Sequence, residues 1–305
     1  MALKIIFMGT PNFAVPILEA IHQSDHKILE VYTQPAKKSG RGQKFNHSDI
    51  FHCAKQLKLS VRAPSEIDTI EEINHFKKLK PDLVVVVAFG KILPTQLLNI
   101  DKMLFINIHA SLLPKWRGAA PIQRAIMNMD YETGVSIMKI VPRLDAGPVM
   151  LQEKIKISEE TSYENLSKKM SGIGAKLILE SIKLIENNKA NFIEQKESEA
   201  TYAKKIQKNE SKINWNESAK KIIAKINAFY PNPGCWFKLS GVRIKIIKAI
   251  EVEKAGNAGV ILDNKMTIAC SKNSVRILEL KKEGKKQMSI DEYLKGNQVK
   301  IGQNL

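Results

Sequence analysis

The sequence has few cysteines, and they form no pattern. Cys53, Cys235 and Cys270 lie far apart, without the paired spacing of a zinc site or a disulfide framework. The six histidines form no HExxH motif or similar cluster. We therefore expect three inert buried thiols and no metal.

Long apolar runs are also missing. The longest, Leu83 to Phe89, is far shorter than the about 20 residues that cross a bilayer. The N-terminus carries Lys4 inside its apolar stretch and then turns to Gly-Thr-Pro, which favours a first strand over a secretory segment. We expect a cytoplasmic protein without a membrane span.

The phosphate-binding loops of common nucleotide enzymes are absent as well. The turn at Gly9 to Phe13 lacks the G-x-G-x-x-G series that lets the backbone approach a pyrophosphate. No G-x-x-x-x-G-K-[ST] sequence exists, and the one Gly-Arg-Gly, at 40–42, lies in a basic loop. A nicotinamide dehydrogenase and an ATP-using enzyme are not expected.

The first 187 residues alternate short apolar runs with helical patterns, which indicates parallel strands joined by crossover helices. Thr161 with Glu164 predicts a capping box for a long helix that ends near Asn187. We predict an α/β fold with a Rossmann-like, mostly parallel sheet domain over residues 1–187. The expected strands are Lys4 to Gly9, Lys27 to Pro35, Asp82 to Phe89, Met103 to Ala110, Gly134 to Val141 and Val149 to Ile157.

The remainder of the chain has a different character. Residues 188–207 are polar with little periodicity, which predicts a linker. Beyond them, one helix, Glu217 to Phe229, precedes several short β-type runs. Their spacing predicts a smaller C-terminal β-barrel domain, OB-like, over residues 208–305.

Charge separates the two halves. The formal net charge of +17 indicates either a polyanionic partner or a drift toward lysine, since Lys outnumbers Arg 41 to 7. Residues 206–305 carry 19 Lys and Arg against 9 Asp and Glu. This skew favours a basic face that binds nucleic acid in the C-terminal domain.

Two polar residues end a predicted buried strand. Strand alternation places Asn107 and His109 on one face, with Ile106 and Ile108 on the other. The carboxyl end of a strand is where ligands bind in open α/β sheets. By itself, however, an Asn-x-His pair is better explained by a structural histidine than by a site.

The residues around this pair form a recognisable set. The strand continues into Ser111-Leu112-Leu113-Pro114 and Trp116-Arg117-Gly118-Ala119-Ala120-Pro121, and Leu144-Asp145-Ala146-Gly147 follows. With these motifs the chain resembles the formyltetrahydrofolate-dependent transferases over essentially its whole length. The resemblance implies an enzyme that takes a formyl group from 10-formyltetrahydrofolate.

The resemblance also implies roles for three catalytic residues. Asn107 would donate to the oxyanion of the tetrahedral intermediate, and His109 would stabilise the same charge or handle a proton. Asp145 would orient the imidazole and relay the proton from the attacking amine.

The same resemblance implies a folate pocket. It would be bordered by Ser111, Leu112, Leu113 and Pro114, with Phe89 and Gly90 beside the pterin. The chain departs from the common pattern at Phe89, where Tyr is frequent, and in the turn from Val141 to Ala146.

A basic loop points to the formyl acceptor. Residues 35–44 carry four cations and two glycines between a strand and a helix, a pattern usually typical of a solvated loop. The members that formylate tRNA carry a similar insertion, which implies that the acceptor is methionine charged on initiator tRNA. The predicted tRNA contacts are Lys37, Lys38, Arg41 and Lys44.

Two alternatives stay open. An enzyme that formylates an amino-sugar nucleotide would share the three catalytic residues, but it would not need the basic loop. A noncatalytic RNA-binding protein could use the same scaffold. We further expect a monomer.

Overall fold

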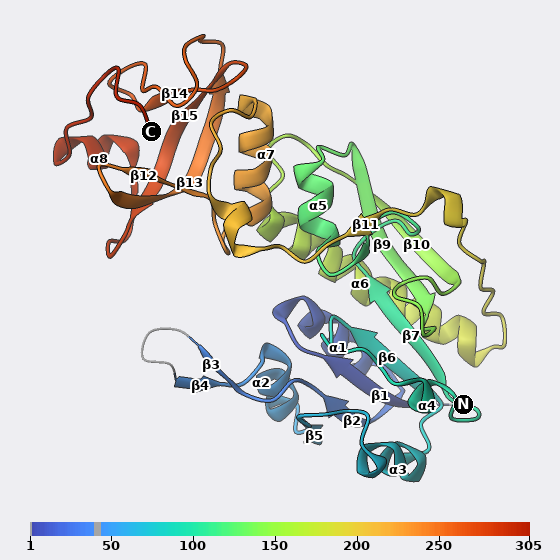
Figure 1. Cartoon of the computed structure of the whole chain (residues 1–305). Helices are drawn as coiled ribbons and strands as arrows, with labels where there is room; N and C mark the ends of the chain where they lie inside the picture. The colour runs from blue at the N-terminus through green and yellow to red at the C-terminus, as the bar shows by residue number, and fades with distance from the viewer. Residues whose placement is uncertain (1, 40–43) are drawn as a thin grey trace. The chain divides into compact units, whose positions relative to one another are not determined.

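Seven strands form the central sheet of the first part of the chain, in a computed structural model that describes residues 2–39 and 44–305 (Figure 1). Their order is β10-β9-β7-β6-β1-β2-β5. The five neighbouring strands β7, β6, β1, β2 and β5 run parallel to one another, and β7 pairs with β9 in the antiparallel sense. The predicted Rossmann-like, mostly parallel sheet is confirmed. The strands are β1 (Lys4–Gly9), β2 (Lys27–Tyr32), β5 (Val61–Arg62), β6 (Leu83–Val87), β7 (Leu104–His109), β9 (Glu132–Lys139) and β10 (Val149–Lys156).

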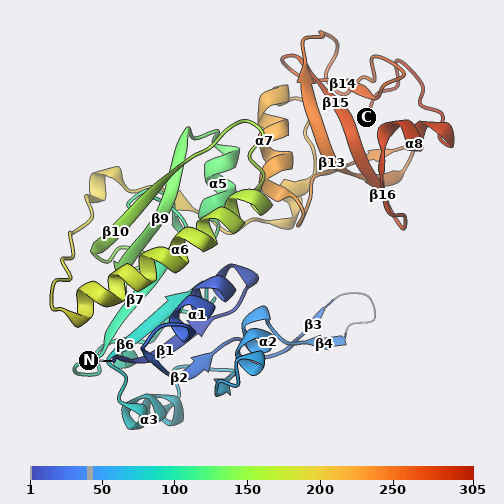
Figure 2. The same ribbon diagram turned by 180° about the vertical axis from the view of Figure 1, so that it is seen from behind.

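Helices cover both faces of this sheet. On one face lie α1 (Val15–His22) and α6 (Tyr163–Glu186), seen from behind in Figure 2. Gly174 of α6 lies close enough to Ile17 of α1 and Ile108 of β7 that a Cβ there would press on both. On the other face, α3 (Ile70–Leu79) and α4 (Thr95–Leu98) enclose an apolar cluster that includes Phe105 of β7. Burial on two faces explains why the central strands β1 and β6 are almost continuously apolar.

The start of α6 differs from the prediction by one residue. The Ser162 hydroxyl accepts the Asn165 N–H at 3.3 Å, which is the bond expected of an N-cap. The Thr161 hydroxyl instead accepts the Ser158 N–H at 2.9 Å. The predicted capping box of Thr161 and Glu164 is therefore wrong, because Thr161 is used by the turn that precedes the helix.

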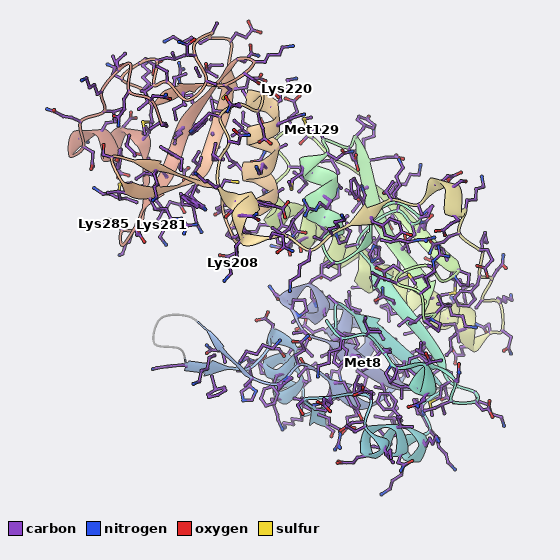
Figure 3. All side chains as sticks on the ribbon, in the orientation of Figure 1. Met8, Met129, Lys208, Lys220, Lys281 and Lys285 are labelled. Atoms are coloured by element: carbon purple, nitrogen blue, oxygen red, sulfur yellow. The ribbon has the colours of Figure 1, made fainter. Side chains whose placement is uncertain are left out.

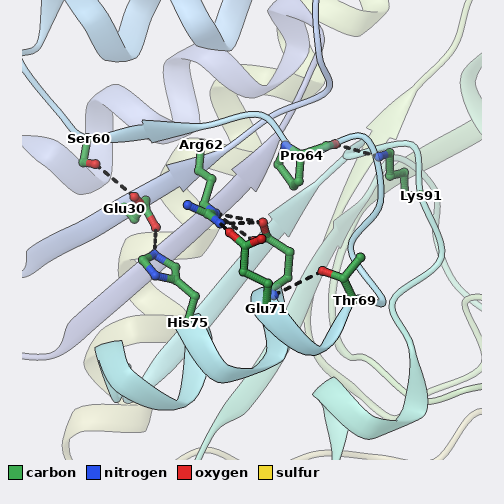
Figure 4. Close-up of polar contacts among 9 residues, drawn as sticks. Glu30, Ser60, Arg62, Pro64, Thr69, Glu71, His75 and Lys91 are labelled. Atoms are coloured by element: carbon green, nitrogen blue, oxygen red, sulfur yellow. Dashed lines mark hydrogen bonds and ion pairs between the residues drawn. The ribbon is translucent and has the colours of Figure 1, made fainter.

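A charged network ties β2, β5 and α3 together (Figure 4). Glu30 binds His75 at 2.5 Å and accepts from Ser60 at 2.9 Å. Arg62 donates through Nε to both oxygens of Glu72, and these bonds raise the pKa of Arg62. Glu30 and Glu72 are both buried. Each needs such partners, because an unpaired buried carboxylate would be strongly destabilising. The network therefore anchors the edge of the sheet.

The chain divides into two compact units, and the second holds most of the C-terminal residues. The first unit comprises Met1–Gly118, Gly134–Ile155 and Ser167–Tyr202, and the second comprises Ala119–Thr133, Lys156–Leu166 and Ala203–Leu305. The predicted domain limits at residues 187 and 208 stay predictions.

An antiparallel sheet forms the core of the second unit, in the order β12-β13-β15-β14 with β16 on β15. Helices α5 (Pro121–Met127) and α7 (Ala219–Phe229) belong to the same unit, and α8 (Ile290–Lys295) follows β16. Arg124 of α5 binds both oxygens of Glu210, at 2.6 and 3.0 Å. The predicted C-terminal β domain is confirmed as an antiparallel sheet domain. Its strands are β12 (Trp236–Leu239), β13 (Val242–Val252), β14 (Thr267–Ala269), β15 (Ser274–Lys282) and β16 (Gln287–Ser289).

The cysteines are free and buried, as expected. Burial raises the pKa of Cys235 to about 12. Over residues 2–39 and 44–305, no three His, Cys, Asp or Glu side chains group as metal ligands would. Within the same described stretches, no helix combines the length and the apolar character of a membrane span.

Candidate active site

The end of β7 carries the central pair of the site. Asn107 lies opposite Val86 of β6, and His109 lies opposite Ser136 of β9. Asn107 is half-buried and His109 is buried. Because Ile108 faces α6, alternation places Asn107 and His109 on the opposite face of the strand. The strand-end placement predicted from the sequence is confirmed.

The imidazole of His109 has a defined orientation. Its Nε2 lies 2.9 Å from the backbone oxygen of Trp116. A carbonyl can only accept, so Nε2 carries the proton and donates it. Nδ1 then faces Asp145, whose Oδ2 is 3.6 Å away and also accepts the Gly118 N–H at 2.7 Å. The structure thus brings together two residues that are 36 positions apart.

The Ser-Leu-Leu-Pro turn is held by hydrogen bonds from two buried serines and from the exposed Gln152. Ser111 is buried and donates to the Lys115 carbonyl at 2.6 Å. The Ser136 hydroxyl accepts the Leu113 N–H at 3.1 Å and donates to the Ser111 carbonyl at 2.6 Å. Gln152 donates to the Leu113 carbonyl at 3.0 Å and to Ser136 at 2.8 Å. Within the turn, Leu112 and Pro114 are half-buried.

Ser136 and Gln152 were not anticipated from the sequence. Ser136 is one polar residue in an otherwise apolar stretch of its strand, and a polar side chain at a position that alternation would bury is the only signal that it gives. Gln152 is exposed and is followed by Glu153 and Lys154, so the sequence does not distinguish it from its polar neighbours.

The turn after β6 presents Phe89 and Gly90. Phe89 is buried, and its carbonyl accepts from Thr10 at 2.9 Å and from the Gln34 amide at 3.0 Å. Gly90 has a φ of +82°, and a Cβ there would overlap the Gln34 amide nitrogen. The backbone conformation therefore favours glycine at this position, and a larger residue would also have to displace the Gln34 amide that donates to the Phe89 carbonyl.

The basic segment after β2 is partly a hairpin. Lys37 and Lys38 lie on β3 (Lys37–Ser39), which pairs antiparallel with β4 (Lys44–Asn46). The three lysines Lys37, Lys38 and Lys44 are exposed. Lys37 also donates to the Gln34 side chain, so the hairpin is linked to the turn at Phe89. Arg41, the fourth predicted tRNA contact, lies outside the described residues.

Arg117 is a fully buried cation beside the site. It donates to Gln195 at 3.0 Å and to Glu197 at 2.9 Å. These bonds from Arg117, together with an ion pair from Arg143, lower the pKa of Glu197. Arg117 therefore connects the loop after β7 to the polar stretch that the sequence predicts as a linker.

A cationic row crosses the antiparallel sheet of the second unit. Lys245 of β13 pairs with Trp236 of β12 on one side and with Lys281 of β15 on the other. The Arg243 guanidinium stacks 4.0 Å from the Trp236 ring centroid. Burial lowers the pKa of Lys245, and Lys281 and Arg243 add to this. Figure 3 labels four lysines of this unit, all with exposed side chains: Lys208, Lys220, Lys281 and Lys285.

Comparison with known proteins assigns the chain. Residues 3–182 match the family described as formyl transferase, and residues 205–298 match the formyl transferase C-terminal domain. The chain belongs to the formyl transferase family. This formyl transferase is 47% identical over 307 residues to the methionyl-tRNA formyltransferase of Pelagibacter ubique, covering 100% of this chain and 99% of that protein. It is 40% identical over 300 residues to the methionyl-tRNA formyltransferase of Afipia carboxidovorans, covering 97% of each.

Solved structures share the fold of this formyl transferase at lower identity. HypX from Aquifex aeolicus in complex with tetrahydrofolic acid superimposes with a TM-score of 0.68 at 17% identity, covering 100% of this chain and 51% of that one. The N-formyltransferase from Helicobacter canadensis, in complex with folinic acid and dTDP-3-aminofucose, gives 0.69 at 22% identity, covering 91% and 99%.

Proposed function

We propose that this formyl transferase moves the formyl group of 10-formyltetrahydrofolate to the free α-amino group of methionyl-tRNA, the initiator species, in the cytoplasm. The observation that carries the proposal is the 47% identity to a methionyl-tRNA formyltransferase over the full length of both chains. The product would be N-formylmethionyl-tRNA for translation initiation.

The described geometry supports roles for Asn107, His109 and Asp145. Asn107 has no side-chain hydrogen bond to any described residue, so its amide can donate to the oxyanion of the tetrahedral intermediate. The His109 Nε2–H is engaged by Trp116, which leaves the edge of the ring at Nδ1 and the Asp145 carboxylate for proton transfer. The amine nitrogen attacks the formyl carbon, and the amine proton passes to this pair. The bond from the formyl carbon to the folate nitrogen then breaks, and the same pair returns a proton to the folate nitrogen as it leaves.

A folate pocket is proposed from the turns around the same strand ends. Phe89 and Gly90 would line the pterin, and Ser111 to Pro114 would border the folate. Support comes from the two related folds, whose structures contain tetrahydrofolic acid or folinic acid. The Ser111 hydroxyl is already engaged by the Lys115 carbonyl, so we expect backbone and apolar contacts from this turn.

The tRNA is proposed to contact two basic surfaces. One is the hairpin that carries Lys37, Lys38 and Lys44, and the other is the row of Lys245 and Lys281. We propose that residues 1–187 form the folate-binding and catalytic domain, that residues 188–207 form the linker, and that residues 208–305 form the tRNA-binding domain. Cations that meet phosphates release counterions, so binding should weaken steeply with salt.

The decisive experiment offers the purified full chain 10-formyltetrahydrofolate with either initiator methionyl-tRNA or an amino-sugar nucleotide. Formyl incorporation is followed by mass spectrometry after the acceptor is isolated. Transfer to the tRNA supports the proposal, and transfer to the sugar alone refutes it. Light scattering of the same sample tests the expected monomer.

A matched pair of variants tests the hairpin. The double variant Lys38→Ala, Lys44→Ala removes two exposed cations, and the slope of log affinity for tRNA against log salt should fall by about one per lost phosphate contact. Lys77→Ala, Lys78→Ala removes two exposed cations of α3 and should leave the slope unchanged. Equal slopes in the two double variants would exclude the hairpin from tRNA binding.

A further inference from the structure

Residues 195–201 form a strap against the two loops that carry the active site. The amide of Gln195 donates to the Asp145 carbonyl at 2.9 Å and to the Gly147 carbonyl at 2.6 Å, and its oxygen accepts from Arg117 at 3.0 Å. This set of partners fixes the orientation of the amide, since carbonyls require the NH2 group and Arg117 requires the oxygen. Gln195, which lies 50 residues away along the chain, therefore holds the backbone of the loop that carries Asp145.

Thr201 holds the other loop. Its hydroxyl accepts the Trp116 N–H at 2.9 Å, and its backbone carbonyl accepts the Arg117 N–H at 2.9 Å. Trp116 has a φ of +60°, a left-handed conformation that is uncommon for residues other than glycine and costs free energy. The carbonyl of this residue is the one that accepts the Nε2–H of His109.

We infer that Gln195 and Thr201 are positioning residues for formyl transfer. Thr201 orients the Trp116 carbonyl and thereby keeps the proton of His109 on Nε2. Gln195 sets the position of Asp145 relative to Nδ1. The inference rests on the proposed function, because it takes the pair of His109 and Asp145 as the group that handles the proton.

Small displacements are enough to matter here. The distance from Nδ1 to the Asp145 Oδ2 is 3.6 Å, beyond the about 2.7–3.2 Å of a direct hydrogen bond. Catalytic bonds of this kind often shorten only in the complex with substrate. A shift of about 1 Å in a catalytic group can lower a rate about 100-fold, so a strap that holds both loops controls whether the pair can close.

The test uses conservative variants of the full chain in steady-state formylation of methionyl-tRNA. Thr201→Val removes the acceptor while keeping the shape, and we expect kcat to fall about 10-fold with KM values within about twofold. Thr201→Ser keeps the hydroxyl and should restore kcat to within about threefold of the wild type. Gln195→Glu keeps the acceptor for Arg117 but loses the donor, and should lower kcat by at least as much as Thr201→Val.

A control within the strap separates this role from general stability. Among the residues that the structure describes, the Glu199 side chain pairs with the exposed Lys196 alone, at 3.3 Å, so Glu199→Ala should leave kcat unchanged. The imidazole ¹⁵N spectrum of the protein without substrate gives an independent readout. His109 should show Nε2–H in the wild type and in Thr201→Ser, and a mixture of tautomers in Thr201→Val.

The outcomes distinguish the two proposals. Wild-type kcat in both Thr201→Val and Gln195→Glu, or equal losses in Thr201→Val and Thr201→Ser, would overturn the positioning role and leave the reaction intact. If the wild type formylates no tRNA, the proposed function fails. The ¹⁵N spectrum then still decides whether Thr201 controls the tautomer of His109.

Discussion

Replacing Asp145 with Asn changes the charge of the active site with little change in its shape. The Asp145 Oδ2 accepts the Gly118 N–H at 2.7 Å and lies 3.6 Å from Nδ1 of His109. An amide oxygen can still accept from Gly118, so the turn should keep its conformation. The variant loses the negative charge and the ability to take a proton.

The size of the effect follows from this distance. When the imidazole has taken up the amine proton in the transition state, it forms a charge pair with Asp145 that at 3.6 Å is worth about 5 kcal/mol at an effective dielectric constant of about 20. Water reaches the site, since the Asp145 side chain is 15% exposed, and reduces this value. We expect the transition state to lose about 3–4 kcal/mol, which lowers kcat about 100- to 1000-fold.

The assay is single-turnover formylation of methionyl-tRNA with saturating 10-formyltetrahydrofolate, alongside thermal unfolding. Asp145→Asn should unfold within about 3 °C of the wild type, because the amide oxygen keeps the hydrogen bond from the Gly118 N–H. Asp25→Asn is the control, since Asp25 is exposed just before β2, at the amino end of the parallel strands. A rate for Asp145→Asn within threefold of the wild type would refute the assigned role.

Three further changes can be predicted from the structure. Ser136→Ala should lower the free energy of unfolding by about 2–4 kcal/mol in urea titrations, because it leaves two buried backbone groups without partners. Gly90→Ala should raise the KM for 10-formyltetrahydrofolate and lower stability by about 1–3 kcal/mol, because it combines a left-handed φ with a clash against Gln34. Hydrogen bonds from Arg124 lower the pKa of Glu210, so that pair stabilises the fold fully above the ordinary carboxyl value of 4.5 and loses its contribution as the pH falls through the lower folded value. Urea titrations of wild type and Glu210→Gln from pH 7 to pH 3 should therefore converge at the acid end.

Much of the fold could be predicted because short apolar runs mark the central strands. Leu83–Val87 is apolar throughout, Leu104–His109 is apolar apart from Asn107 and His109, and both lie where expected. Details that depend on one local hydrogen bond could not be predicted. Thr161 and Ser162 are both good N-caps, and only the turn at Ser158 decides which of them is used.

The candidate site likewise contains residues that the sequence indicates and residues that only the structure reveals. Asn107, His109 and Asp145 lie in motifs, so the sequence indicates them, and the structure places His109 beside Asp145. Gln195 and Thr201 could not be identified, because they lie in a polar stretch with no periodicity. Their partners are 50 and 85 residues away, and such contacts become visible only in the folded chain.

The strap determines where the chain can be truncated or joined to another domain. A fragment that ends at residue 187 would contain every predicted catalytic and folate-binding residue, yet it would lack both Gln195 and Thr201. Insertions in the segment that carries them would move two loops at once, although exposed polar connectors usually accept extra residues. Truncated variants and domain exchanges should therefore keep the chain continuous through Tyr202, where the first compact unit ends.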